Sequence, residues 1–190
     1  MKKEYDIIVV GAGPAGSMAA RFAAEQGVSV LMLEKDRDVG YPVRCGEAIS
    51  KVGVEEFIPS DDKWIAAKIS KFSFNAPDGT EVILDFGEAG YVLERRIFDY
   101  ELARTAAHAG ADILTRAYVN GLLFDSGKVS GVKYEYNGSP DQIRTGDGRS
   151  RVSHARPLHY GAKPLGADDY QCRILSLRFA HIAYWKHVPS

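Results

Sequence analysis

The first thirty-four residues alternate between apolar runs and a glycine-rich turn. Residues 7–10 are a continuous run of Ile and Val, which is typical of a parallel strand buried on both faces. The pattern of residues 14–26 favours a helix with Pro14 in its first turn. Residues 28–33 form a second apolar run after Gly27, which can cap the helix. This order predicts a strand, a helix and a second parallel strand.

Three glycines separate the first predicted strand from the helix. Gly11, Gly13 and Gly16 form the pattern G-x-G-x-x-G. In this pattern the first glycine makes a tight turn, the second lets a pyrophosphate approach the backbone, and the third lets the helix pack on the strand. Glu34 ends the second strand, where a carboxylate accepts hydrogen bonds from a ribose hydroxyl. The pattern predicts a dinucleotide site, argues against NADP, and leaves FAD and NAD both open.

Further periodic segments follow along the chain. Residues 68–86 alternate around the turn Ala76-Pro77-Asp78-Gly79, which predicts an antiparallel hairpin inserted into the α/β chain. Residues 90–93 indicate another strand. A helix is expected from about residue 96, and a parallel strand from residue 112 to 114. The apolar side of that helix consists of Phe98, Leu102, Ala106 and Ala109.

The periodic pattern ends after a second predicted hairpin. Residues 119–124 and 128–136 alternate across Ser126-Gly127, and Asn137-Gly138 is a strong type I′ turn signal. The next residues have no useful period of 2 or 3.6, so no returning strand is expected. We therefore expect an FAD-binding or NAD-binding domain portion at residues 1–138 and a separate tail at residues 139–190.

The tail differs from the rest in charge. Its 52 residues hold eight Lys or Arg against four Asp or Glu, together with four of the five histidines. Three interpretations remain open: a basic arm that binds nucleic acid or an anionic membrane, a disordered extension, and out-of-frame or read-through sequence. We expect disorder or an out-of-frame origin, with no nucleic-acid partner. The histidines lack the paired spacing of a zinc site, and no metal is expected.

Two segments outside the glycine turn are candidates for the ligand site. The loop at residues 35–50 follows the second strand at the carboxyl end of the sheet, which places Arg44 and Cys45 near the expected ligand. An ordinary surface loop with an incidental thiol is the alternative. Arg95 precedes the second helix, and its guanidinium is either a solvated charge or a partner of the dinucleotide phosphates.

Composition describes an ordinary globular chain. The net charge is −1 and 45% of the residues are hydrophobic. No apolar run is long enough to span a bilayer, so a cytoplasmic location is expected. Cys45 and Cys172 are far apart in the sequence and match no metal-binding spacing, which favours free thiols in a reducing compartment.

Four stretches of the first 138 residues resemble the geranylgeranyl reductase family, and most of all its archaeal digeranylgeranylglycerophospholipid reductases. The stretches are VVGAGPAGS at residues 9–17, LEK at 33–35, PVRCGEAIS at 42–50 and GYVLERRIFDYELA at 90–103. The Arg-Cys-Gly-Glu and Glu-Arg-x-x-Phe-Asp runs carry the resemblance more specifically than the glycines do. Members of the family use FAD to saturate isoprenoid chains in membrane lipid biosynthesis.

The resemblance implies a truncated Rossmann-like α/β FAD-binding domain with a parallel sheet, a β-hairpin insertion and an irregular C-terminal tail. It implies an isoprenoid lipid substrate and peripheral contact with a membrane. It assigns no catalytic acid and no electron donor. The alternatives are an FAD-dependent monooxygenase-type enzyme and a non-catalytic dinucleotide-binding remnant. The positions that would contact FAD by this resemblance are Ala15, Glu34, Cys45, Gly46, Ala48, Arg95 and Val119.

The chain departs from the family pattern after residue 138. The family continues through an Ala-Asp-Gly segment to a Gly-Asp-Ala motif that holds the ribityl and pyrophosphate groups. This chain has Gly146-Asp147-Gly148, but residues 142–145 before it are not patterned as a buried strand. We therefore do not equate this segment with the family motif, and we expect the chain to be an incomplete fragment of the family fold.

Overall fold

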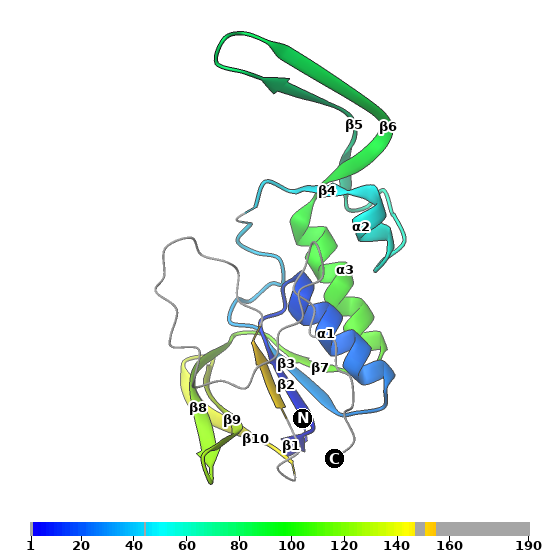
Figure 1. Cartoon of the computed structure of the whole chain (residues 1–190). Coiled ribbons are helices and arrows are strands. Elements are labelled where there is room, and N and C mark those ends of the chain that lie inside the picture. Colours follow the sequence, from blue (N-terminus) through cyan, green and yellow to red (C-terminus); the bar gives the residue numbers. More distant parts are fainter. Residues whose placement is uncertain (1, 44, 147–150, 155–190) are drawn as a thin grey trace.

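A four-stranded parallel sheet forms the centre of the computed structural model, which describes residues 2–43, 45–146 and 151–154. Its strand order is β11–β2–β3–β7, and every neighbouring pair is parallel (Figure 1). The strands are β2 (Ile7–Val10), β3 (Val30–Leu33), β7 (Asp112–Leu114) and β11 (Arg151–His154). The expected α/β fold with a strand–helix–strand unit at its start is confirmed.

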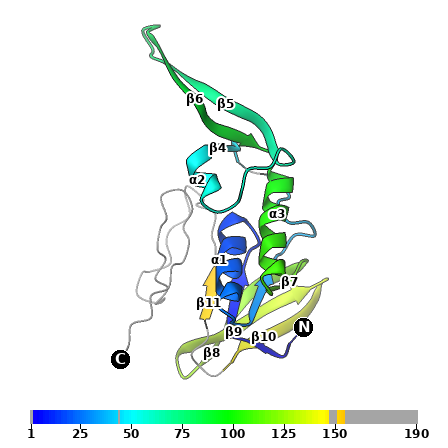
Figure 2. The ribbon, with the colours of Figure 1, turned by 90° about the vertical axis from the view of Figure 1, so that its right-hand side faces the viewer.

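Two helices cover one face of this sheet. Helix α1 (Pro14–Glu25) and helix α3 (Arg95–His108) lie side by side, as Figures 1 and 2 both show. Their small residues allow close contact with the strands, and one buried cluster joins the two helices to the sheet. The cluster consists of Val9, Ala12, Ala20, Ala24, Val30, Met32, Ala103, Ala106 and Ala111.

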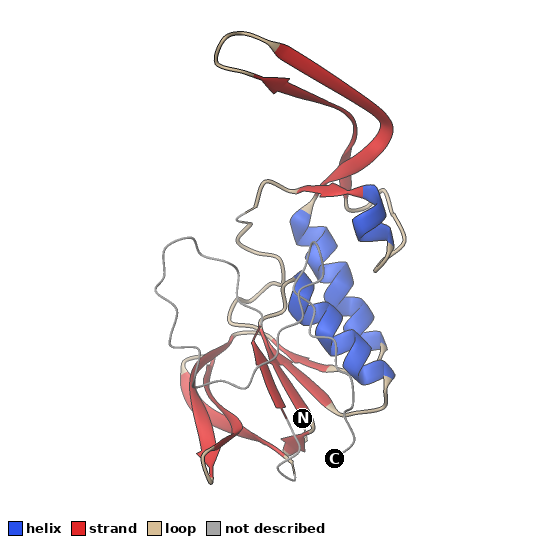
Figure 3. Ribbon diagram, viewed as in Figure 1, coloured by secondary structure: helices blue, strands red, loops and turns tan. Residues whose placement is uncertain are grey.

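A mixed sheet, in which β1 and β10 pair parallel and the other neighbours antiparallel, covers the opposite face and makes three layers (Figure 3). Its order is β1–β10–β9–β8. Successive side chains along a strand point to opposite faces of the sheet, so every second one faces the central sheet. The strands are β1 (Glu4–Tyr5), β8 (Ala117–Asp125), β9 (Lys128–Tyr136) and β10 (Ser139–Thr145). The buried cluster on this side consists of Tyr5, Ile8, Leu31, Leu33, Ala117, Val132, Tyr134 and Ile143.

Strand β10 corrects one expectation from the sequence. Asn137 and Gly138 both have positive φ, as a type I′ turn requires, and the chain then returns along β9. The sequence analysis expects no strand at residues 139–145, and this expectation is wrong. Ile143 is buried because Tyr5 and Val132, which are distant in sequence, supply its packing partners. Residues 151–154, expected to belong to the irregular tail, form β11 beside β2, so that expectation is wrong there too. The expected origin of the tail, and the disorder expected of its other residues outside the described ranges, stay predictions.

A third, smaller sheet carries the predicted hairpin insertion. Strand β6 (Glu81–Leu93) lies between β4 (Ala48–Ser50) and β5 (Ile65–Asn75), and helix α2 (Lys51–Glu55) follows β4. Residues 90–93, expected as a separate strand, are the end of β6. The far part of the hairpin projects away from the body (Figures 1 and 2). Its base is anchored by a cluster of Met18, Val54, Ile58, Trp64, Tyr91, Leu93, Phe98 and Leu102.

None of the helices in the described ranges combines the length and the apolar character needed to cross a membrane.

The packing of β10 can be tested by removing its buried side chain. Replacing Ile143 by Ala should destabilise the chain by about 2–4 kcal/mol, because it leaves a cavity against Tyr5 and Val132. Gln142 is exposed on the same strand, so Gln142→Ala should change the free energy of unfolding by less than about 0.5 kcal/mol. Urea denaturation followed by circular dichroism measures both values. Equal effects of the two substitutions would show that β10 does not pack on the core.

Candidate dinucleotide-binding site

The turn between β2 and α1 has the geometry of a phosphate-binding loop. Gly11 has φ of 99°, a left-handed value that favours glycine, and its N–H donates to the Leu33 carbonyl at 2.7 Å. A Cβ on Gly16 would lie 1.9 Å from the Gly11 carbonyl oxygen, so the helix approaches the strand as closely as a glycine permits. A Cβ on Gly13 would meet no atom within 4 Å, so the loop is open on that side.

The start of helix α1 faces this open side without a side-chain cap. Gly13 is its N-cap residue, and the first turn holds no acidic residue. Pro14 and Ala15 occupy the first two helical positions. The first N–H groups of a helix lack partners within the helix and carry the positive end of its dipole. An uncapped start of this kind is suited to an anion such as a pyrophosphate.

Glu34 lies at the end of β3 and connects it to the glycine turn. One of its carboxylate oxygens accepts from the Ala12 N–H at 2.8 Å, and the other accepts from the Asp36 N–H at 3.0 Å. Its backbone also bridges two neighbouring segments, since its N–H donates to the Leu114 carbonyl and its carbonyl accepts from the Ala117 N–H. Each carboxylate oxygen keeps a second acceptor site, which a ribose hydroxyl can use.

Arg95 is the first residue of α3, and its guanidinium is held in an ion pair with Asp99. Its Nε and Nη2 atoms each donate to an Asp99 carboxylate oxygen at 2.8 Å, and Asp99 is only 4% exposed. The pKa of Arg95 is raised, chiefly by Asp99 and to a smaller extent by the neighbouring Cys45. Burial raises the pKa of Asp99, the Arg95 pair offsets part of that rise, and the Glu34 charge adds to it.

The loop after β3 brings the remaining candidates to the same end of the sheet. Cys45 is exposed, and its sulfur accepts from the Glu47 N–H at 3.4 Å. The Gly46 carbonyl accepts from the Ala48 N–H at 2.8 Å, and Ala48 begins β4 opposite Val92. Arg44, also expected near the ligand, lies outside the described residues. Gly46 and Ala48 follow Cys45 directly in this loop and at the start of β4.

Val119 lies on β8 beside an irregularity in the strand pairing. The register changes between the pair Val119–Tyr134 and the pair Gly121–Lys133, so Asn120 has no partner in the ladder. A bulge of this kind leaves backbone groups out of the regular hydrogen-bond pattern. The Val119 side chain itself is half-buried.

Three residues with a structural role in the site were not singled out by sequence reasoning. Ser17 is fully buried, and its hydroxyl donates to the Ala12 carbonyl at 3.1 Å, which holds the glycine turn. Asp99 fixes the Arg95 side chain, and the i,i+4 spacing of this pair was the available signal. A Cβ on Gly40 would lie 2.9 Å from the Arg95 carbonyl oxygen, so this loop glycine sets how closely the loop packs on α3.

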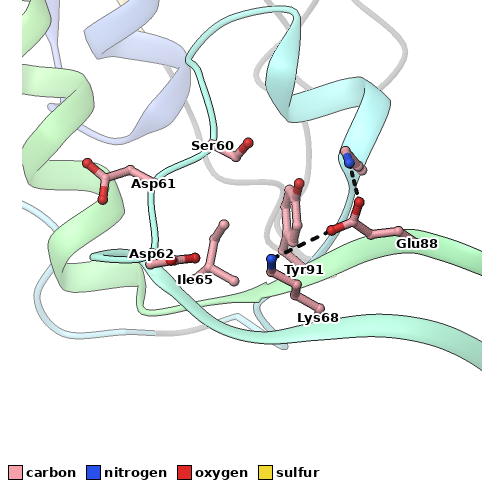
Figure 4. Close-up of a pocket in the computed structure, with 8 residues that line it drawn as sticks. Ser60, Asp61, Asp62, Ile65, Lys68, Glu88 and Tyr91 are labelled. Atoms are coloured by element: carbon pink, nitrogen blue, oxygen red, sulfur yellow. Dashed lines mark hydrogen bonds and ion pairs between the residues drawn. The ribbon is translucent and has the colours of Figure 1, made fainter.

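One hollow in the described ranges lies away from the glycine turn. It has a volume of about 480 Å³ and lies between α2 and the base of the hairpin (Figure 4). Glu88 pairs with both Lys51 and Lys68 there, and the hydroxyl of Tyr91 donates to Glu55 at 2.9 Å. The lining residues are Lys51, Ser60, Asp61, Asp62, Ile65, Lys68, Glu88 and Tyr91. Both lysines of this hollow are paired with the same carboxylate.

The residues at the carboxyl end of the parallel sheet fit a dinucleotide. An open glycine turn faces an uncapped helix start, and a carboxylate with spare acceptor sites lies beside them at the end of β3. In the described ranges, no three His, Cys, Asp or Glu side chains gather in an arrangement that could hold a metal ion. The arrangement suits binding of a cofactor with two phosphates and a ribose.

Comparison with known proteins gives the same assignment. The chain is 49% identical over 142 residues to the digeranylgeranylglycerophospholipid reductase of Methanocella arvoryzae, which covers 73% of this chain and 36% of that protein. It is 40% identical over 178 residues to the reductase of the same name from Methanosarcina mazei, covering 88% of this chain and 44% of the relative. The chain thus spans well under half the length of the relatives it matches.

A solved structure supports the fold as well. The crystal structure of a geranylgeranyl bacteriochlorophyll reductase-like protein from Thermoplasma acidophilum superposes with a TM-score of 0.74 at 39% sequence identity. The superposition covers 80% of this chain and 39% of that protein. The resemblance to the geranylgeranyl reductase family that the sequence motifs indicate is therefore confirmed.

The choice between FAD and NAD, which the glycine pattern leaves open, is decided by a match to a family model. The model is described as FAD binding domain, and it matches residues 4–144. This range contains the glycine turn, Glu34 and the Arg95 pair, and it continues into β10. The chain therefore belongs to the FAD-binding domain family.

Proposed function

We propose that this chain supplies the FAD-binding portion of an FAD-dependent oxidoreductase that reduces double bonds in the isoprenoid chains of membrane lipids. One observation carries the proposal. The stretch that builds the whole candidate site is almost half identical to a protein named digeranylgeranylglycerophospholipid reductase. No comparable observation favours a monooxygenase, because solved structures of flavin-dependent halogenases at 22–23% identity support the fold alone.

We propose that FAD lies along the carboxyl end of the parallel sheet. The turn formed by Gly11, Gly13, Ala15 and Gly16 would hold the pyrophosphate against the start of α1. The Glu34 carboxylate would accept hydrogen bonds from the ribose, beyond the two that it already accepts from backbone N–H groups. The adenine would lie near the backbone of Val119, two residues after the Ala117 N–H that donates to Glu34.

The other candidates would lie toward the flavin end of the cofactor. Arg95 keeps Nη1 and further N–H groups beyond the two that bind Asp99, so it can donate to a phosphate without losing its ion pair. Cys45 would lie beside it, followed by Gly46 and Ala48, and Arg44 belongs to the same proposed set. Ala48 is small and exposed, as a close approach of the cofactor requires.

Bound FAD would supply the hydride chemistry at its flavin ring. The residues of this chain would bind and orient the cofactor and keep water from the phosphates. No described residue is assigned as the proton donor for the reduced double bond. We propose a lipid of the digeranylgeranylglycerophospholipid class as the substrate, and a cytoplasmic protein that reaches it through peripheral contact with the membrane.

A pair of glycine substitutions separates FAD binding from folding. Gly13→Ala should lower FAD affinity at least about tenfold, because its methyl group fills the open side where the pyrophosphate must lie. It should leave the melting temperature within about 2 °C, since a Cβ there touches nothing. Gly16→Ala should instead destabilise the fold by about 1–3 kcal/mol, because its Cβ collides with the Gly11 carbonyl oxygen.

FAD titration by flavin fluorescence and thermal melting, run on the same preparations, measure these two effects. FAD affinity of Gly13→Ala equal to that of the unaltered chain would show that the phosphates bind elsewhere. An unchanged melting temperature for Gly16→Ala would contradict the close approach of α1 to β2.

Turnover tests the proposed reaction. The 190-residue chain alone, given FAD, dithionite and a geranylgeranyl lipid, should yield no saturated product above the free-flavin background, because it matches only 36% of its relative. A fusion of this chain to the part of the Methanocella arvoryzae reductase outside the match should yield that product. Mass spectrometry of the lipid measures the reduction.

The fusion has two controls. The unaltered M. arvoryzae reductase fixes the full activity, and the fusion carrying Gly13→Asp should lose both FAD and product, because bulk and negative charge fall where the pyrophosphate must lie. An inactive fusion beside an active relative would contradict the proposed function. Full activity of the Gly13→Asp fusion would contradict the site.

A further inference from the structure

The projecting hairpin of β5 and β6 has one apolar face and one polar face. Cross-strand pairs run from Phe72–Leu84 to Phe74–Val82 on one face, and the rings of Phe72 and Phe86 meet edge to face with centroids 6.1 Å apart. The apolar face consists of Phe72, Phe74, Val82, Leu84 and Phe86, each 40–59% exposed. Five large apolar side chains thus form one continuous surface with nothing packed on it in the described part of the chain.

The opposite face holds almost all the polar groups. The Lys71 ammonium pairs with the Asp85 carboxylate at 3.0 Å, and the Ser73 hydroxyl donates to Glu81 at 2.6 Å. Ile83 is the only large apolar residue of that face between residues 71 and 85, and it is 59% exposed. The alternation is that of a strand pair with one face in water and one face in a protein core.

The free strand edges are open as well. Strand β5 is an outer strand of its sheet, and β4 pairs only with residues 90–92 of β6. Along residues 81–89 both edges of the hairpin therefore present backbone groups, on the same segment that carries the apolar face. A long exposed strand edge beside an apolar face marks an interaction site, where further strands or another layer pack on the sheet.

Charge decides between the occupants that could cover this face. Residues 65–93 contain two lysines against four carboxylates. Membrane-binding elements carry an excess of Lys and Arg instead, which argues against a lipid surface. Two copies joined through this face would bring together two segments of the same net negative charge, which argues against a second copy of this chain.

The match to known reductases indicates what covers the apolar face of the hairpin. The family match at residues 4–144 contains the whole hairpin, and the relatives carry most of their chain outside the matched part. We infer that the apolar face of the hairpin packs against that remaining part of the reductase chain, which joins the FAD-binding portion to the rest of the enzyme. This inference rests on the proposed function, since it takes the partner from the same reductases.

The test uses this chain co-expressed with the affinity-tagged part of the Methanocella arvoryzae reductase that lies outside the match. The unaltered chain should co-purify as a one-to-one complex, measured by size-exclusion chromatography with light scattering. Phe74→Ser should weaken the complex about tenfold or more, because it removes a large apolar contact. Ile83→Ser is the matched control: the same 59% exposure on the opposite face should give a change of less than about threefold.

A second measurement does not require the two parts to fold separately. In the single-chain fusion, Phe74→Cys should react with a maleimide at least about tenfold more slowly than Ile83→Cys, because only residue 74 is covered. Peptide mass spectrometry distinguishes these thiols from Cys45. Equal labelling rates would overturn the inference.

Several outcomes would overturn it in other ways. The absence of a complex, or equal weakening of it by Phe74→Ser and Ile83→Ser, would do so. So would self-association of the chain, or binding to phosphatidylcholine–phosphatidylglycerol vesicles, if Phe74→Ser abolishes it. Lipid reduction assayed on the same samples separates the two proposals. A complex that Phe74→Ser weakens but that saturates no lipid would support the packing and contradict the proposed function. An active enzyme that Phe74→Ser does not affect would support the proposed function and contradict the packing.

Discussion

The close approach of helix α1 to strand β2 is the constraint on which the candidate site depends. A side chain on Gly16 would overlap the Gly11 carbonyl oxygen, so this crossing is available only to glycine. The turn is then held by Ser17, whose N–H donates to the Gly13 carbonyl at 2.9 Å and whose hydroxyl donates to the Ala12 carbonyl. The result is a helix start that points its unpaired N–H groups across the carboxyl end of the sheet.

Glu34 extends this arrangement across the sheet. Its carboxylate binds the Ala12 N–H of the glycine turn, while its backbone connects β3 to Leu114 of β7 and to Ala117 of β8. A group that is fixed from several sides loses little freedom when a ligand arrives, and such preorganisation lowers the cost of binding. The glycine turn and the ends of β3, β7 and β8 are therefore held in one geometry by the backbone and the carboxylate of Glu34.

The elements that sequence reasoning predicted correctly are those with local signals. The strand–helix–strand unit follows from apolar period and glycine spacing, and the turns at Ala76–Gly79 and Asn137–Gly138 follow from turn chemistry. Strand β10 was missed because its sequence, SPDQIRT, buries only Ile143 and Thr145, whose partners lie on β9 and on β1 at the start of the chain. A strand of this kind has almost no period of its own to detect.

The same distinction explains the candidate site. Gly11, Gly13, Gly16 and Glu34 lie within one continuous unit of the sequence, and their roles follow from its spacing. Cys45 and Arg95 come from a loop and from the first turn of α3, fifty residues apart, and Gly40 of the same loop packs against the backbone of Arg95 and Arg96. Each was a candidate from its own place in the chain, but no local pattern connects the two residues.

The buried pair of Arg95 and Asp99 gives the site its charge balance. Without the guanidinium, the buried Asp99 carboxylate would lie near Glu34 with no compensating cation, and both would repel an incoming phosphate. With it, Arg95 cancels one of these charges and still has N–H groups free to donate. A planar guanidinium can serve a carboxylate and a second anion together, whereas a lysine ammonium at this place would have to share one point charge. Arginine at this position is therefore explained by the two acidic groups around it as much as by the expected phosphates.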